Sequence, residues 1–371
     1  MNHGWEKKRL GDVCQINFGK RIVAKDTPPG PYYVYGGGGA TFTTMDYNRE
    51  NCMIVSRFAM SPECVRFVRG RFFLNDSGLS VQSNNGLLTQ EFVEKYLWAI
   101  QPQIYNLGRG AAQKNLNTKS FSEMPIPIPA VEVQRQIVSE LDKINEMLEV
   151  KRGQLKDLDM LSQSLFYEMF GEPFINSKGW IITSFGDLAL SINYGTSLPA
   201  TECGKYPYIR MNNLTDNGYL DLSSLKYIDI PDSEIDKCIV KKGDILFNRT
   251  NSREKVGKTA LFDRTEEMVI AGYIIRVRAK EEILNPVFAV RYMNLPELKE
   301  HLRKICRGAV NQANINSKEM ASIPFMVPPI ELQNEFSVRV EAIEEQKRVI
   351  ESTISDLEVL LASRMDYWFN D

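Results

Sequence analysis

The sequence contains little of the chemistry that catalysis needs. Gly257-Lys258-Thr259 resembles the end of a P-loop, but the glycine that this motif requires five residues earlier is replaced by Ser252. Only two histidines occur, His3 near the terminus and His301 in a predicted helix, so a histidine metal site or a catalytic triad would have to rest on these two, and both are expected at the surface. The Pro-Pro pairs lack the flanks of an amino-methyltransferase motif, and Glu6-Lys7-Lys8 lacks the upstream Pro-Asp of a nuclease. The sequence therefore predicts a binding protein without a catalytic site.

Basic and amide side chains are the chemical groups that stand out. Seven lysines and arginines lie between residues 237 and 258, interleaved with amide and hydroxyl side chains and opposed by only two acidic residues. Such side chains donate hydrogen bonds to DNA phosphates and to base edges. A sparser set of the same kind surrounds Arg57 and Asn75 in the first half. A solvated loop is the alternative interpretation of the dense segment.

An internal repeat organises the elements that must position these groups. Trp5, Gly11 and Asp12 recur 175 residues later as Trp180, Gly186 and Asp187. At an offset of 199, Gln-Lys-Asn-Leu-Asn-Thr-Lys at 113–119 matches Gln-Ala-Asn-Ile-Asn-Ser-Lys at 312–318, and the matched residues that follow are Pro125 and Pro324, Pro129 and Pro328, Glu132 and Glu331, and Gln134 and Gln333. The segments between these anchors differ by 24 residues and show no evident similarity. Each half is thus a variable body between constant ends.

A long amphipathic helix is predicted after each proline-rich stretch. Apolar residues recur at steps of four and three positions, which is typical of a coiled-coil seam. Because the second helix keeps the register of the first, we expect an antiparallel pair; burial of each helix in its own domain is the alternative. The predicted seam is Ile137, Leu141, Ile144, Leu148, Leu155, Leu158, Phe336, Val340, Ile343, Ile350, Ile354 and Leu357.

Proline-rich segments set the predicted boundaries. Pro125–Pro129 and Pro324–Pro329 are predicted to be extended, since proline disfavours helix. The predicted parts are a body at 1–128, a helix at 129–171, a body at 172–328 and a helix at 329–371. Runs such as Val269 to Val277 predict strands and runs such as Val287 to Lys304 predict helices, so each body is expected to mix both.

The net charge of −2 is the sum of the charges of unlike parts. The two bodies carry +5 and +2, and the two helices carry −3 and −6. Positive bodies favour contact with nucleic acid, and the acidic positions predict helices that stand largely in solvent. No apolar run approaches the roughly 20 residues of a membrane span, and the six cysteines form no CxxC pair. We therefore expect a cytoplasmic protein with no membrane contact, zinc knuckle or disulfide framework.

The doubled arrangement of Gln-x-Asn-Leu/Ile-Asn, prolines, Glu-x-Gln and a heptad helix resembles the specificity subunit of Type I restriction-modification systems. The resemblance extends from Trp5 to Trp368, and Gly36–Gly39 and Asp244–Arg249 are similar to segments of that family's target-recognition domains. It implies an α+β fold, with two mixed α/β target-recognition domains separated by two long antiparallel coiled-coil-like helices in a pseudo-twofold internal repeat.

The resemblance also implies a function without catalysis. Each target-recognition domain would read one half of a bipartite target on double-stranded DNA, while the helices set the spacer and dock two modification subunits. Restriction subunits would complete the nuclease, and S-adenosylmethionine, ATP and Mg would bind to the partner subunits and not to this chain. The candidate DNA contacts are Lys20, Arg21, Arg57, Asn75, Asn84, Arg109, Gln113, Asn115, Arg249, Asn251, Arg253, Lys255, Lys258, Arg307, Gln312 and Asn314.

Other classes of protein remain as alternatives. A nuclease or methyltransferase in one body would make the chain an enzyme, which the missing motifs disfavour. A non-catalytic helical scaffold would bind proteins and no DNA, although it would have no reason to separate positive bodies from negative helices. An orphan DNA-binding protein without active partners would share every feature above.

Overall fold

The computed structural model describes residues 4–84, 86–110, 113–307 and 313–369. It divides into two compact units, one formed by Met1–Gly153 with Glu351–Asp371 and the other by Gln154–Ile350. The two long helices are α5 (Val131–Phe170) and α10 (Ile330–Phe369). Both boundaries between the units fall inside these helices, so each unit combines one body with one half of each helix.

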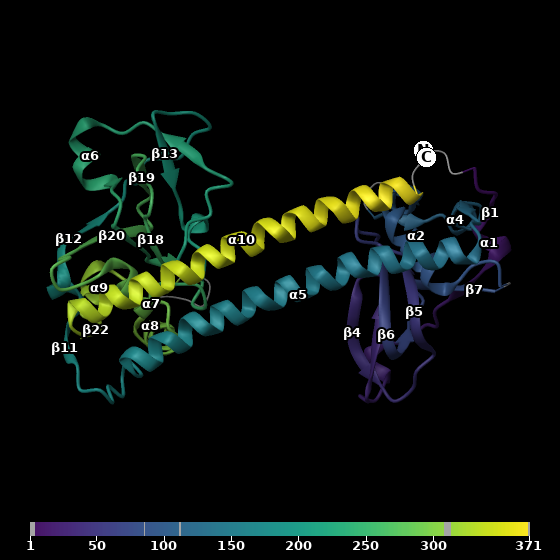
Figure 1. Ribbon diagram of the computed structural model, residues 1–371, viewed down its shortest axis with the longest axis horizontal. Coiled ribbons are helices and arrows are strands. Elements are labelled where there is room, and N and C mark those ends of the chain that lie inside the picture. The colour runs from purple at the N-terminus through teal and green to yellow at the C-terminus, as the bar shows by residue number, and fades with distance from the viewer. Residues whose placement is uncertain (1–3, 85, 111–112, 308–312, 370–371) are drawn as a thin grey trace. The chain divides into compact units, whose positions relative to one another are not determined.

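The body of the first unit is built on a six-stranded sheet in the order β2-β7-β5-β6-β3-β4 (Figure 1). Neighbouring strands are antiparallel except for β3 and β6, which are parallel. Helix α2 (Gln90–Ala99) packs on β6 and β7 through one apolar face that includes Phe92 and Leu97. The strands are β2 (Cys14–Phe18), β3 (Tyr32–Gly36), β4 (Gly39–Thr44), β5 (Arg49–Ser56), β6 (Val65–Leu74) and β7 (Gly78–Ser83).

Shorter elements complete this body. Strand β10 (Pro125–Pro127) pairs with β1 (Lys7–Arg9), so the first proline-rich segment is extended and lies against the N-terminal strand. Strand β8 (Gly108–Arg109) pairs with β9 (Asn115–Leu116). The remaining helices are α1 (Leu10–Val13), η1 (Ala24–Asp26), α3 (Gln101–Asn106) and α4 (Thr118–Ser122).

The body of the second unit repeats part of this plan. Its first sheet has the order β12-β20-β16-β18, with all neighbours antiparallel, as in the β2-β7-β5-β6 part of the first unit. A separate sheet, β14-β13-β19-β15, has its own small apolar core around Tyr208 and Val269. The strands are β12 (Ala189–Tyr194), β13 (Tyr206–Ile209), β14 (Lys226–Ile228), β15 (Ile239–Val240), β16 (Ile245–Asn248), β18 (Thr259–Leu261), β19 (Met268–Ile270) and β20 (Ile274–Ala279).

The ends of the second body also match those of the first. Strand β22 (Pro324–Val327) pairs with β11 (Ile181–Ser184), as β10 pairs with β1. The other elements are η2 (Phe185–Leu188), η3 (Met211–Asn213), α6 (Asp232–Cys238), β17 (Thr250–Asn251), α7 (Pro286–Met293), α8 (Pro296–Ile305), β21 (Ala313–Asn314) and α9 (Ser317–Ala321).

The predicted extents of two elements in the second body were wrong. The run Val269 to Val277 belongs to two strands of different sheets, β19 and β20, because the chain turns at Gly272. The run Val287 to Lys304 forms two helices, since α7 ends at Met293 and Pro296 begins α8. In both cases apolar periodicity continues across a turn.

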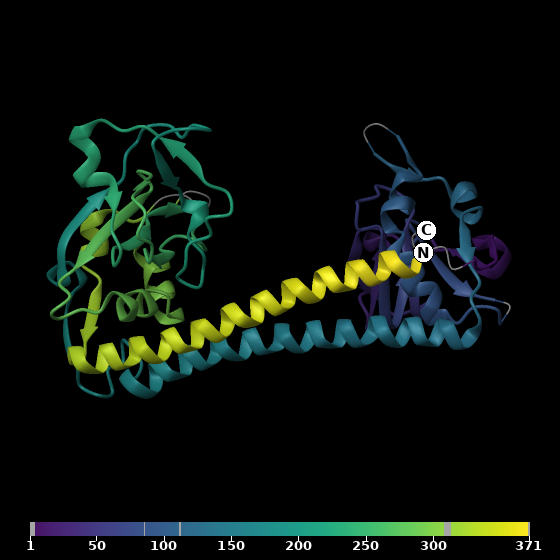
Figure 2. The ribbon, with the colours of Figure 1, turned by 45° about the horizontal axis from the view of Figure 1, so that its top comes forward.

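Within each unit the two helix halves run antiparallel (Figures 1 and 2). In the first unit Arg152 Nη2 lies 2.9 Å from Glu358 Oε1, and in the second Lys347 Nζ lies 2.7 Å from Asp159 Oδ1. Of the seam residues, Ile137, Leu141, Ile144, Leu148, Phe336, Val340 and Ile343 are buried. Leu155, Leu158, Ile350, Ile354 and Leu357, toward the middle of the helices, are half-buried.

The repeated Glu-x-Gln motif ties the start of each long helix to a body helix. Gln134 is fully buried; its Nε2 donates to the carbonyls of Leu87 (2.8 Å) and Pro129 (2.9 Å), and its Oε1 accepts from Thr89 N (2.7 Å). Thr89 is the N-cap of α2. Gln333 makes the same three bonds, to the carbonyls of Ile283 and Pro328 and from the backbone N of Asn285, which caps α7.

Aromatic residues fix the last turn of each long helix. At the end of α5, Phe170 packs on Phe288 with ring centroids 4.8 Å apart. At the end of α10, Phe369 packs on Phe92 at 5.7 Å, and Trp368 stacks with Trp5 at 6.3 Å. Each helix therefore starts on one body and ends in contact with the other.

Candidate nucleic-acid interface

In the first unit, Arg57 lies just beyond β5 against aromatic rings. Its Cζ is 4.9 Å from the ring centroid of Phe18 and 4.6 Å from that of Phe58, and both rings are substantially exposed. Its backbone N donates to Ser77 O, and its backbone O accepts from Leu116 N, each at 2.8 Å. Cation–π contacts of this kind hold the guanidinium in place, and its Nη1 also donates to Asp76 O at 3.3 Å.

Several other predicted residues lie at the same edge of the body. Asn115 Oδ1 accepts from Ala59 N at 3.3 Å, and Arg109 pairs with Asn115 across β8 and β9. Asn75 Oδ1 accepts from Ser77 N at 2.9 Å. Lys20 N donates to Leu74 O at 2.9 Å. The fold thus gathers five predicted DNA contacts, Lys20, Arg57, Asn75, Arg109 and Asn115, from four separate segments.

The glycine run beside this edge is a close-packed turn between β3 and β4. Gly37 O accepts from Ser56 Oγ at 2.6 Å, and Gly37 N donates to Ser77 Oγ at 3.0 Å. A Cβ on Gly36 would lie 2.5 Å from Ser77 Oγ, so a larger residue there would have to displace the Ser77 side chain.

The other predicted residues of the first half lie apart or make no described polar contact. Asn84 follows the opposite end of β7, where its backbone N donates to Val13 O at 3.3 Å. Arg21 and Gln113 are exposed; Arg21 follows Lys20, and Gln113 lies two residues before β9. Asn84 is therefore not part of the edge around Arg57.

In the second unit, Arg249 occupies the matching place just beyond β16. Its Cζ lies 4.8 Å from the ring centroid of Tyr194. Its backbone N donates to Tyr273 O at 3.0 Å, and its backbone O accepts from Ile315 N at 2.9 Å. Its Nε is buried and has no hydrogen-bond partner among the described residues.

Predicted residues in and near the second copy of the repeated Gln-x-Asn segment, at 312–318, lie next to this arginine, as those of the first copy lie next to Arg57. Strands β17 and β21 pair Thr250 with Asn314 and Asn251 with Ala313. Arg307 and Asn314 exchange backbone hydrogen bonds of 3.0 and 2.7 Å. Within the described ranges, Asn314 Oδ1 is a second buried polar atom at this edge without a partner. Gln312 lies outside the described residues.

The remaining basic candidates of the second half are mostly engaged by their own unit. Arg253 Nε and Nη2 donate to Arg303 O at 3.2 and 3.1 Å, at the end of α8. Lys258 Nζ lies 2.9 Å from Asp216, and Arg307 Nε lies 2.6 Å from Glu319. Lys255 is exposed. The dense basic segment is thus not one patch, since Lys242 precedes β16 and Arg249 follows it.

The aromatic partners of the two arginines were missed in the sequence. Phe18 and Tyr194 belong to the segments Ile-Asn-Phe-Gly at 16–19 and Ile-Asn-Tyr-Gly at 192–195, which match at an offset of 176. This short repeat lies just after the first matched anchors and is the signal that could have identified them. It also places the start of the variable part of each body after residues 19 and 195.

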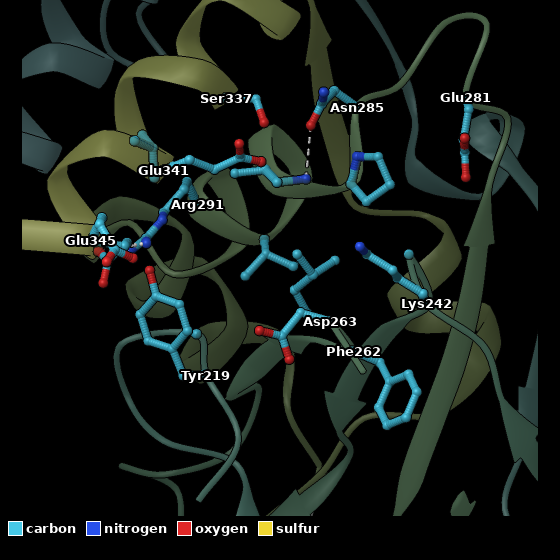
Figure 3. A pocket seen from close by; sticks show the side chains of 18 of the residues that line it. Tyr219, Lys242, Phe262, Asp263, Glu281, Asn285, Arg291, Ser337, Glu341 and Glu345 are labelled. Atoms are coloured by element: carbon cyan, nitrogen blue, oxygen red, sulfur yellow. Dashed lines mark hydrogen bonds and ion pairs between the residues drawn. The ribbon is translucent and has the colours of Figure 1, made fainter. Parts of the chain in front are cut away.

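A cavity beside a long helix forms a second kind of surface. In the second unit, a cavity of about 730 Å³ lies between α7 and the first half of α10, with Tyr219 and Arg291 on one side and Lys242 and Glu281 on the other (Figure 3). Arg291 Nη2 lies 2.9 Å from Glu344 Oε1, and burial lowers the pKa of Arg291. Glu344 is buried, so the expectation that the acidic helix positions face solvent was wrong there.

The first unit has a cavity in the corresponding place. It measures about 1060 Å³ and lies between α2, β6 and the first half of α5. Its wall includes Phe67, Trp98 and the ion pair of Lys95 with Asp142. Burial raises the pKa of Glu94, also in this wall, to about 7.

Two other kinds of site were sought within the described parts of the chain. No three or more His, Cys, Asp and Glu side chains there are grouped so as to hold a metal ion. None of the described helices has the length and apolar character of a membrane span.

Comparison with solved structures supports the fold. An S subunit of a Type I restriction-modification system from M. genitalium superposes with a TM-score of 0.60 at 18% identity, covering 100% of this chain and 97% of that one. A chain from structural work on complex assembly and conformational transition of the type I R-M system gives a TM-score of 0.60 at 18% identity, covering 98% and 96%.

Curated relatives are specificity subunits. The EcoKI specificity subunit of Escherichia coli (strain K12) is 22% identical over 271 residues, which cover 68% of this chain and 58% of that protein. The MjaVIII specificity subunit of Methanocaldococcus jannaschii is 20% identical over 375 residues, which cover 92% and 86%. The family profile described as the Type I restriction modification DNA specificity domain matches residues 2–160 and again 177–358. The chain therefore belongs to the Type I restriction-modification DNA specificity family, with one copy of the domain in each half.

Proposed function

We propose that this chain is the DNA-binding specificity subunit of a Type I restriction-modification complex, and that each body reads one half of a bipartite target. The observation that carries the proposal is a feature that recurs in each body. An arginine is held over an aromatic ring, next to the Asn of the repeated Gln-x-Asn segment. Arginine and asparagine side chains are the common donors to phosphates and base edges.

The predicted contacts do not contribute equally to this proposal. Lys20, Arg57, Asn75, Arg109 and Asn115 form the DNA-contacting edge of the first body, and Arg249, Asn251 and Asn314 form that of the second. Arg253, Lys258 and Arg307 remain candidates whose present partners DNA would have to displace. The unread spacer between the two half-sites is set by α5 and α10.

The long helices and the cavities beside them are the proposed contact surface for two modification subunits. Two equivalent places, one against α2 and α5 and one against α7 and α10, support two copies of one partner. The chain's own function is recognition, exercised in the cytoplasm. S-adenosylmethionine for adenine methylation belongs to the modification subunits, and ATP and Mg belong to the complex that restriction subunits complete.

The test is a genome-wide map of N6-methyladenine in cells with the gene, without it, and with it restored. We expect a bipartite motif that disappears on deletion and returns with the wild-type gene but not with an Arg57→Ala, Arg249→Ala variant. A methylome unchanged by deletion would contradict a role in modification. A gel shift of the purified chain with its co-purifying partners then separates an orphan DNA-binding protein from a scaffold that binds none.

A further inference from the structure

The two bodies hold Arg57 and Arg249 by the same set of bonds. The backbone N of each arginine donates to the carbonyl of the residue that precedes the last strand of its sheet, Ser77 before β7 or Tyr273 before β20. The backbone O of each arginine accepts from the backbone N of the residue after the repeated Asn, Leu116 after Asn115 or Ile315 after Asn314. Each guanidinium lies over the aromatic residue that ends the first strand of the sheet, at 4.9 and 4.8 Å.

Close backbone packing fixes this geometry in both bodies. The glycine after each aromatic residue, Gly19 or Gly195, donates its N to Gly78 O or Ile274 O. A Cβ on Gly19 would lie 1.8 Å from Asn75 O, and a Cβ on Gly195 would lie 2.1 Å from Ile270 O. The strand end that carries the aromatic ring is therefore held against the same part of the sheet in each case.

What surrounds the two arginines differs. The first body continues its sheet into the β3-β4 hairpin with its glycine turn, whereas the second builds the separate β14-β13-β19-β15 sheet. Side chains that read different base sequences have to differ between the bodies, because direct readout depends on the donor and acceptor pattern of each base. The two arginines keep one geometry although their surroundings differ. They are therefore suited to contact the phosphate backbone, which is the same for every DNA sequence.

The charge of both arginines is available to such a contact. Within the described ranges neither arginine forms an ion pair, whereas Lys258 and Arg307 each have an acidic partner. Arg57 Nη1 donates to one carbonyl, that of Asp76, at 3.3 Å. A guanidinium that is stacked on a ring presents its free edge to two phosphate oxygens at once.

We propose that Arg57 and Arg249 are matched phosphate clamps, one in each half-site, which set the position of each body on the DNA backbone while neighbouring residues read the bases. The inference rests on the proposed function, since it requires that both bodies bind DNA. It assigns the two arginines to positioning and removes them from sequence readout.

The experiment measures binding of the full chain to two short fluorescent duplexes, one A·T-rich and one G·C-rich, by anisotropy between about 50 and 200 mM KCl. Each lost phosphate contact lowers the slope of log K against log[salt] by about 0.9. We expect Arg57→Ala and Arg249→Ala each to lower the slope by that amount on both duplexes, and the double variant to lower it by about twice as much.

Two variants separate binding from folding. Arg264→Ala removes an exposed arginine that is paired with Asp263 elsewhere in the second body, and it should leave the slope unchanged. Arg249→Lys keeps the charge but loses the planar guanidinium that can bind two oxygens at once. The slope of log K against log[salt] should therefore be retained while affinity falls. Thermal unfolding of each variant identifies any loss of binding that is due to unfolding.

The outcomes are distinct. An unchanged slope in both alanine variants, or a change in preference between the two duplexes, would overturn the phosphate assignment and leave the proposed function intact. A wild-type chain that binds neither duplex at any salt concentration would refute DNA binding by this chain and the inference with it.

Discussion

Arg364 in the last turns of α10 donates through Nη2 to Oε2 of Glu140 on α5, at 3.2 Å, and Trp368 Nε1 donates to the same oxygen at 3.1 Å. The two segments are 224 positions apart in the chain. Together with the contacts of Phe369 on Phe92, these bonds make the end of α10 a part of the first unit. The first unit is therefore completed only by the last helix.

Glu140→Gln should destabilise the first unit by about 1 kcal/mol, because a charge-assisted bond is lost at a partly exposed site. The hydrogen bond from Arg364 holds the pKa of Glu140 below its usual range, so this contribution is present at neutral pH and is lost as the pH falls through the lowered pKa. Urea denaturation at neutral and acid pH measures both effects. Glu146→Gln, at an exposed position of the same helix, is the control. Equal losses in the two variants would contradict the assigned role.

Gln134→Ala should cost about 3 kcal/mol or more. The change leaves two carbonyls and one backbone N–H without their buried partner, and each unsatisfied group costs on the order of 1–3 kcal/mol. Gln333→Ala should have a similar effect in the second unit. Chemical denaturation provides the measurement, and Gln136→Ala, exposed on the same helix, should change stability by less than about 0.5 kcal/mol. A mild effect at Gln134 would mean that water replaces the side chain.

Glu94 should make stability fall as the pH rises from about 5 to 7. Burial raises its pKa from 4.5 to about 7, so the folded state holds a proton that the unfolded state has already released in this range. The stabilisation is complete below the unfolded pKa and is lost as the pH rises through the folded value. Thermal midpoints of the wild type and Glu94→Gln across this range check the prediction, since the variant should show a flatter dependence. Glu123→Gln, at an exposed position of the same unit that does not act on Glu94, should keep the wild-type slope.

Gly19→Ala and Gly195→Ala should each destabilise their unit by about 1–3 kcal/mol, because the added Cβ meets a backbone carbonyl that cannot move independently of its strand. Since Phe18 and Tyr194 precede these glycines, DNA binding should weaken as well. Gly38→Ala is the matched control, as a Cβ there meets nothing within 4 Å. Melting temperatures and anisotropy together measure the two effects. Wild-type stability in both variants would show that the strand ends can separate without cost.

The sequence by itself determined the doubled plan of the chain. The heptad positions, the proline segments and the repeated Gln-x-Asn motif depend on local spacing, which a single chain displays directly. Pro125–Pro127 and Pro324–Val327 are extended, and α5 and α10 are helices throughout their described lengths. The family followed from the same local features, because they occur twice in one order.

Tertiary structure alone decided which charged groups are available for a ligand. Lys258 and Arg249 look alike in the basic segment, yet Lys258 is paired with Asp216 while Arg249 lies over Tyr194. Glu344 is one of several acidic residues on α10, but it is buried and forms an ion pair with Arg291 of α7. Partners of this kind come from distant segments, so their identity depends on strand order and helix packing, and periodicity along the chain carries no information about them.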